Sequence, residues 1–254
     1  MRDASPSLRP GTPGSRGSVD VVRVQLRLLD AFEVVCDGHT VRLPSIAQRL
    51  VAFVALHERP VERGYVAGML WLDTPDQRAA GNLRTALWRV QARARGLLDA
   101  SGHRLRLEPG VRVDLRVAEQ SARREIGGTE TSCEVGLFTG DLLPDWYDDD
   151  WLLLERERFR QLRLRALDAL CARHLHAGRH GQALEAGLLS LAGEVLRESA
   201  HRALIRVHLA EGNAVEALRQ YRLCRRLLHD QLGIEPTQQL LDLIGTLDEV
   251  KTNG

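Results

Sequence analysis

Residues 73–95 read DTPDQRAAGNLRTALWRVQARAR and predict a turn followed by a long helix. The tetrapeptide at 73–76 is typical of a turn, and Asp76 is the candidate N-cap of a helix that runs to about Arg95. On a helical wheel, one side of this helix is apolar, and we expect that side to pack inward. The apolar positions are Ala79, Leu83, Leu87, Val90 and Ala94.

The opposite side of the same helix carries the side chains that we expect to contact a partner. A long arginine hydrogen-bonds guanine edges or phosphates, a threonine meets a thymine methyl, and an exposed tryptophan packs on sugar-phosphate. We therefore predict base contacts in the major groove of DNA from Arg78, Thr85 and Arg89. For any single arginine, a solvated surface position is an equally good interpretation, and Trp88 could instead lie under the second half of the chain. The remaining candidates, Arg84 and Arg95, lie at the margin of this face and are expected to contact phosphates.

The segments before this helix predict three short strands and two helices. Apolar and polar residues alternate over 22–28, which is the period of a half-buried strand. Two further strands flank Asp37-Gly38, a strong signal for a two-residue hairpin turn. The expected strands are 22–28, 32–36 and 39–43, and the expected helices are 46–57, with Ser45 as N-cap, and about 62–72.

A second hairpin is expected after the long helix, with strands at 103–107 and 111–115 that are joined by a turn at 108–110. This order of strands, three helices and a hairpin matches a winged helix-turn-helix, with the second hairpin as the wing. The pattern alone is also compatible with another small α+β domain. The polar face of the expected wing, which would project toward a neighbouring groove or the DNA backbone, carries Arg104, Arg106 and Arg112.

Length and composition limit the number of domains and the cellular location. A chain of 254 residues with 44% hydrophobic residues is long enough for one large or two modest domains. No run of about 18 apolar residues is present for a membrane span. Residues 1–19 lack the apolar core of a signal peptide and are expected to form a disordered tail. We therefore expect a cytoplasmic protein that has no membrane partner and that is associated with the nucleoid when it is bound to DNA.

The charge is unevenly distributed along the chain, although the formal net charge is only +1. Residues 20–117 carry 15 Arg against 11 Asp and Glu, a net charge of +4. Residues 131–254 carry 15 Lys and Arg against 19 Asp and Glu, a net charge of −4. A basic front half suits an approach to phosphates, and the acidic back half suits a different role.

The second half of the chain has an almost entirely helical pattern that contains a repeat. After a connector at 118–130, we expect helices at about 150–177, 181–192, 197–211, 214–230 and 236–249. A displacement of 34 residues is the period of tetratricopeptide repeats, which stack paired helices and bind partner proteins. The positions that recur with this displacement are Gly178, Ala183 and Leu184, followed by Gly212, Ala217 and Leu218.

Neither a metal site nor an enzyme active site is expected. His176 and His180 are four residues apart, but Gly178 lies between them at a helix end and no third ligand is near. The acidic segment 145–150 could hold a cation, yet carboxylates at a helix start are also favoured by the helix dipole. The four cysteines form no C-x-x-C pair. Since no nucleophile elbow or general acid/base pair is present, we expect no cofactor and no catalytic residue.

Several separate motifs carry a resemblance to a known family. Five segments in the second half are similar to the bacterial transcriptional activation domain. Combined with NLRTAL at 82–87 in a winged helix, they resemble the Streptomyces antibiotic regulatory protein (SARP) family over about residues 20–250. The five segments are LLPDWY at 142–147, ERER at 155–158, LRESAHR at 196–202, EALRQY at 216–221 and LGIEP at 232–236.

This resemblance implies both an architecture and a function. The expected fold is mainly α with small β sheets: a winged helix-turn-helix at 20–117, a linker at 118–130 and an all-α, tetratricopeptide-like activation domain at 131–254. The implied function is activation of secondary-metabolite (antibiotic) biosynthetic genes by a homodimer that binds direct repeats in promoter DNA. The implied protein partner is the RNA polymerase holoenzyme, contacted through its sigma factor and other subunits. Two alternatives stay open: a helical-repeat adaptor whose N-terminal domain binds protein, and a repressor with the same architecture.

Overall fold

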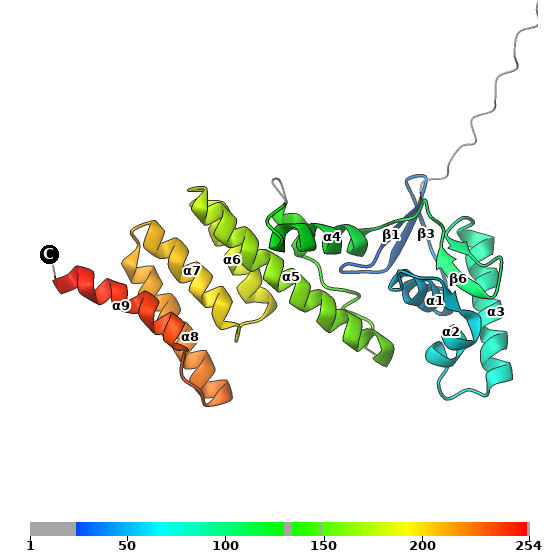
Figure 1. Ribbon diagram of the computed structural model, residues 1–254. Helices are drawn as coiled ribbons and strands as arrows, with labels where there is room; N and C mark the ends of the chain where they lie inside the picture. The colour runs from blue at the N-terminus through cyan, green and yellow to red at the C-terminus, as the bar shows by residue number, and fades with distance from the viewer. Residues whose placement is uncertain (1–23, 130–133, 148, 253–254) are drawn as a thin grey trace, which may run out of the picture.

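The computed structural model describes residues 24–129, 134–147 and 149–252, so the predicted disordered tail at 1–19 lies outside the described residues. The described chain is elongated, with helix α3 (Asp76–Arg93) at one end and the C-terminal helix α9 (Gln238–Thr252) at the other (Figure 1). The fold is mainly helical with two small sheets, as the sequence predicted. None of the described helices is long and apolar enough to cross a membrane.

The N-terminal sheet begins with the three strands that the alternating pattern predicted. Strands β1 (Val24–Arg27), β2 (Glu33–Cys36) and β3 (His39–Val41) are antiparallel neighbours. The turn between β2 and β3 has positive φ at both central residues, 48° at Asp37 and 83° at Gly38. A two-residue turn of this kind matches the right-handed twist of the strands that it joins. The Asp37-Gly38 hairpin is therefore confirmed.

Three helices follow the sheet, and two of them begin differently from the prediction. Helix α1 spans Ser45–Ala55, α2 spans Arg63–Leu70, and α3 begins at Asp76. The residue before α1 is Pro44 and the residue before α3 is Pro75, and neither helix has a side-chain cap. The prediction of Ser45 and Asp76 as N-caps is therefore wrong by one position. A proline fits the cap position because it lacks an N–H group that would need a partner there.

The wing is built from different strands than the sequence predicted. Strand β6 (Arg104–Leu107) pairs with β5 (Leu98–Asp99) and with β4 (Val61–Glu62), so the wing is the β5–β6 hairpin. Strand β7 (Arg112–Val113) does not pair with β6 but lies parallel to β1 in the N-terminal sheet. The predicted 103–115 hairpin is wrong because alternation fixes which face of a strand is buried and does not fix its partner.

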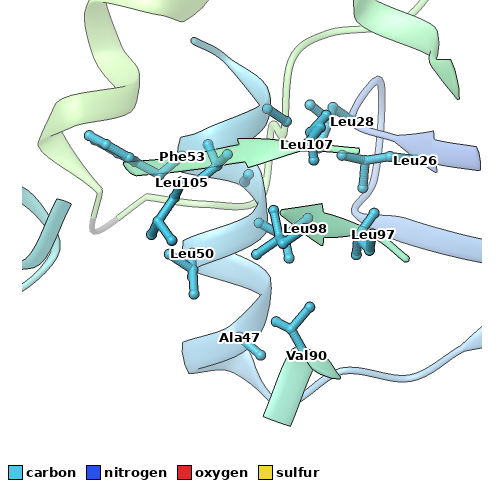
Figure 2. Packing of buried hydrophobic residues seen from close by; sticks show 14 of the residues in the cluster. Leu26, Leu28, Ala47, Leu50, Phe53, Val90, Leu97, Leu98, Leu105 and Leu107 are labelled. Carbon is cyan, nitrogen blue, oxygen red and sulfur yellow. The ribbon is translucent and has the colours of Figure 1, made fainter. Parts of the chain in front are cut away.

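Two segments far apart in the sequence share one core. Leu26, Leu50 and Leu105, from β1, α1 and β6, are fully or almost fully buried in the same cluster (Figure 2). Leu142, Leu143, Leu152 and Phe159 belong to this cluster too, although they come from the second half of the chain. The winged helix therefore does not enclose its core alone.

The predicted connector at 118–130 is a helix over most of its described length. Helix α4 spans Asp114–Ile126 and packs along α5 (Asp150–His176) (Figure 1). Ala118 and Ala122 face inward and are buried. Glu125, whose side chain is 1% exposed, accepts a hydrogen bond of 2.8 Å from Arg173 Nε of α5. The connector prediction is wrong because the buried positions of α4 within this segment are two small alanines and the charged Glu125, which give a weak hydrophobic pattern.

The segment just before α5 joins the N-terminal sheet. The backbone N–H of Asp30 donates to Asp141 O at 2.7 Å, and that of Leu143 donates to Leu28 O at 2.9 Å. Arg49 of α1 forms an ion pair of 2.7 Å with Asp149, whose side chain is only 9% exposed. Backbone pairing, shared core and ion pair together hold the helical half against the winged helix.

The remaining helices form the predicted repeat. Helices α6 (His180–Gly193), α7 (Glu198–Ala210), α8 (Ala214–Leu232) and α9 stack after α5 (Figure 1). Gly178 between α5 and α6 and Gly212 between α7 and α8 have positive φ of 69° and 74°. Ala183 and Ala217, the next recurring positions, are both fully buried. The 34-residue displacement therefore relates two equivalent turns between helices. It also relates the two buried alanines in the helices that follow these turns.

Candidate nucleic-acid interface

Helix α3 is oriented as the helical wheel predicted. Ala79, Leu83, Leu87 and Val90 are at most 8% exposed, and Ala94 just after the helix is 2% exposed. Ala86, which the sequence reasoning did not place inside, is also fully buried. The inward face packs against α1 and α2, which leaves the opposite face of α3 at the end of the molecule (Figure 1).

The predicted contact residues of α3 lie on its outer face. Arg78, Arg84, Thr85 and Trp88 are exposed, as is Arg95 after the helix, and Arg89 is half-buried. Trp88 is 71% exposed, so the alternative that it lies under the helical half is wrong.

This outer face carries positive charge that the described residues do not neutralise. The only carboxylate of α3 is Asp76 in its first turn. Within the described ranges, no side-chain hydrogen bond or ion pair is found for Arg78, Arg84, Arg89 or Arg95. Arg93, near the end of the helix, differs because it donates to Arg42 O at 3.0 Å. The arrangement leaves several guanidinium groups available to an anionic partner.

The wing arginines, in contrast, are exposed but paired with carboxylates. Arg104 lies 3.2 Å from Glu62 of β4, and Arg106 lies 2.9 Å from Asp99 of β5. Hydrogen bonds from the Ser101 hydroxyl and backbone N–H, together with Arg106, lower the pKa of Asp99 to about 2. Asp99 is therefore ionised at neutral pH and holds both the wing turn and the Arg106 side chain.

Arg112, the third arginine that was predicted on the wing, lies apart from the other predicted contact residues. Arg112 lies on β7, where it is paired in register with Gln25, and it lines a groove of about 400 Å³ between the N-terminal sheet and α4. It is therefore not on the wing.

The sequence reasoning also missed two residues that shape the wing. Arg63, the first residue of α2, donates its backbone N–H to His103 O at 3.0 Å, and its guanidinium donates to Ala100 O. His103 is exposed at the wing tip. Neither residue could be placed there until β5, which has only two residues, was known to be the strand that pairs with β6.

Metal binding finds no support in the part of the chain that the structure describes. No group of three or more His, Cys, Asp and Glu side chains there is placed to hold a metal ion. His176 Nδ1 contacts Ala172 O at 2.8 Å within its own helix.

A comparison with protein families decides how this arrangement is classified. Residues 112–247 match the family described as the bacterial transcriptional activator domain. The chain belongs to this family. The match begins in β7, ahead of α4, and thus earlier than the expected limit of the activation domain at residue 131.

Two curated relatives from Streptomyces align with almost the whole chain. The chain is 24% identical to the regulatory protein AfsR of Streptomyces griseus over 95% of its own length, and 27% identical to AfsR of Streptomyces coelicolor over 92%. It spans about a quarter of the length of these curated relatives. The predicted resemblance to the SARP family is confirmed at the level of family membership.

A solved structure of Mycobacterium tuberculosis EmbR, in complex with a low-affinity phosphopeptide, has the same fold. The TM-score is 0.64 at 20% identity, and the alignment covers 88% of this chain and 64% of the EmbR chain.

Proposed function

We propose that this SARP-type regulator is a sequence-specific DNA-binding transcriptional activator that places α3 in the major groove of double-stranded promoter DNA. The observation that carries the proposal is the outer face of α3. It presents exposed arginines that lack partners among the described residues, and after Asp76 it has no carboxylate that would repel phosphates. Release of counterions from DNA by such cations supplies much of the binding free energy.

The geometry supports separate roles along α3. Arg78 and Arg89 are assigned to guanine edges, because a guanidinium donates two parallel hydrogen bonds to one guanine. The hydroxyl of Thr85 donates to Gly81 O at 3.1 Å, which leaves the Thr85 methyl for apolar contact with a thymine methyl. Arg84 and Arg95 are assigned to phosphates, and the Trp88 ring to the sugar-phosphate backbone.

In this proposal the wing adds contacts to the sugar-phosphate backbone of the DNA. Arg104 and Arg106 would face phosphates beside the groove that α3 occupies, but each must share its guanidinium with Glu62 or Asp99. We therefore expect each wing arginine to contribute less than an unpaired arginine of α3. Arg112 is left out of the proposed interface because it lies on the N-terminal sheet.

The wider biological role is proposed from the family. We propose that the protein binds direct repeats as a homodimer, activates secondary-metabolite (antibiotic) genes, and recruits the RNA polymerase holoenzyme through its helical half. Support comes from membership of the bacterial transcriptional activator domain family and from Streptomyces relatives that are regulatory proteins. The repeat architecture of α5–α8 is of the kind that binds partner proteins.

The deciding experiment measures binding to fragments of candidate promoters over a range of salt concentrations, followed by footprinting. We expect tight binding with a steep salt dependence and protection of two repeats. Single replacements of Arg78, Thr85 or Arg89 by Ala should weaken specific binding by about 1–3 kcal/mol and relax preference at particular base positions. Arg165→Ala, an exposed arginine of α5, is the matched control and should change nothing. Full sequence preference in the triple variant would refute the placement of α3.

A further inference from the structure

Helix α8 carries a second basic surface at the opposite end of the molecule from α3 (Figure 1). The α8 cationic face consists of Arg222, Arg225, Arg226 and His229, all of them exposed. Their spacing places them on one side of the helix, within an arc of about 100°. The buried positions Ala217, Cys224 and Leu228 lie on the other side, packed in the core of the last helices. The cationic face opens onto a groove of about 670 Å³ that is also lined by Tyr221, Asp230 and Glu235.

The charges on this face exceed the carboxylates that meet it. Glu235 lies 3.0 Å from Arg225 and 3.7 Å from His229. Arg222 and Arg226 have no side-chain hydrogen bond or ion pair among the described residues. Asp230 lies at the groove but forms no ion pair with these arginines in the described part of the chain. Two guanidinium groups one helical turn apart therefore form no ion pair within the described part of the chain, and the three arginines of this face outnumber the two carboxylates that line the groove.

The stability of α8 does not explain this arrangement. Like charges four residues apart on a helix destabilise it by about 0.2–0.5 kcal/mol per pair. The helix dipole favours cations only in the last turn, and Arg222 lies more than two turns before the end of the helix at Leu232. The cationic face thus has a local cost to the helix, and binding of an anionic partner would offset it.

Glu235 shows what kind of group this face accepts. The chain reverses at Gly233, which has a positive φ of 66°, and the reversal brings the Glu235 carboxylate back against α8. Both Arg225 and Glu235 are 58% exposed in this pair. An exposed ion pair contributes only about 0–1 kcal/mol, so a carboxylate from outside can replace Glu235 or bind beside it. Carboxylates fit arginines closely because a guanidinium donates two parallel hydrogen bonds.

We infer that the α8 cationic face is a docking groove for a segment of a partner protein that is rich in Asp and Glu. Charge complementarity identifies the occupant, and the groove volume is within the range of ligand-binding pockets in proteins. The position of α8 at the far end from α3 leaves this face accessible when α3 is occupied (Figure 1). The inference does not depend on whether α3 reads DNA.

The test uses the full chain and a short fluorescent peptide that alternates Glu with Ser, with a Gln-Ser peptide as the neutral probe. We expect the acidic peptide to bind more tightly than the neutral one, with an affinity that falls as salt rises. The R222E/R226E variant should lose at least about tenfold in affinity. The matched control, R124E/R165E, reverses two exposed arginines of α4 and α5 that have no side-chain partner among the described residues, and it should bind like the wild type.

Three outcomes would overturn the inference. Equal binding of both peptides would exclude recognition of carboxylates, and equal losses in both double variants would show an unspecific effect of net charge. Binding of a random DNA duplex that depends on Arg222 and Arg226, without binding of the acidic peptide, would assign the face to nucleic acid. If R222E/R226E does not fold, the milder R222Q/R226Q variant gives the same readout. R222E/R226E should bind promoter DNA like the wild type, so failure here and failure of the proposed function are distinguishable.

Discussion

The shared core makes a sharp prediction about stability. Leu152 of α5 is fully buried in the cluster that contains β1 and α1, whereas its neighbour Leu153 is 56% exposed. Replacement of Leu152 by Ala should therefore destabilise the winged helix, although residue 152 lies outside it. The Leu153→Ala variant removes the same atoms from a solvated position and is the matched control.

The size of the effect follows from burial. A fully buried leucine contributes about 1.5–3 kcal/mol through removal from water, and the cavity left by alanine raises the total loss to about 2–5 kcal/mol. The exposed Leu153 should cost no more than about 0.5 kcal/mol. With a urea slope of about 3 kcal/mol per molar, the Leu152→Ala midpoint should fall by roughly 1 M.

The assay combines urea denaturation with hydrogen exchange followed by mass spectrometry. In Leu152→Ala, peptides that cover β1 and α1 should lose protection together with peptides of α5, because one core connects them. Equal midpoints for the two variants, or protection of β1 and α1 that is unchanged in Leu152→Ala, would refute the shared core.

Other predictions concern individual positions. Leu87→Ala, at 8% exposure on the inner face of α3, should lower the free energy of unfolding by about 2–5 kcal/mol in urea denaturation, and an unchanged midpoint would contradict the helix phase. Gly178→Ala and Gly212→Ala should each lower the free energy of unfolding by about 1–2 kcal/mol. A Cβ at either site meets no other atom, so the strain comes only from the positive φ. Unequal losses in the two variants would contradict the equivalence of the two turns. Burial lowers the pKa of His201 below its ordinary 6.5, so the unfolded chain binds the extra proton more readily. Stability should be constant above about pH 6.5 and fall below it. His201→Gln should flatten this dependence in part, since the pKa of His174 is also lowered; an unaltered pH profile would exclude His201.

Local features of the fold were predictable from the sequence, and long-range pairing was not. The turn at Asp37-Gly38 and the inward face of α3 depend on residues that are close in the sequence, so the local sequence pattern was sufficient to predict them. The partner of β6 depends on Leu98, which follows a short loop and belongs to a two-residue strand. The pairing of Leu143 with Leu28 joins residues more than a hundred positions apart, and no local pattern reports it.

In the candidate site, too, local features were predictable from the sequence and long-range contacts were not. The exposed side of α3 could be predicted from helical spacing, including the position of Trp88. The ion pairs that neutralise the wing could not, because Glu62 and Asp99 meet Arg104 and Arg106 only through strand pairing. Placement of Arg112 on the wing failed for the same reason.

The attachment of residues 141–143 to residues 28–30, just after β1, has a consequence for promoter geometry. Because this attachment and the Arg49–Asp149 pair fix the helical half to the winged helix, a bound protein would point α5–α9 toward a single side of the DNA duplex. Moving the binding site by half a helical turn, about 5 base pairs, would rotate the helical half to the opposite side, whereas a full turn of about 10 base pairs would restore it. Activation should therefore oscillate with the spacing between operator and promoter instead of declining smoothly with distance.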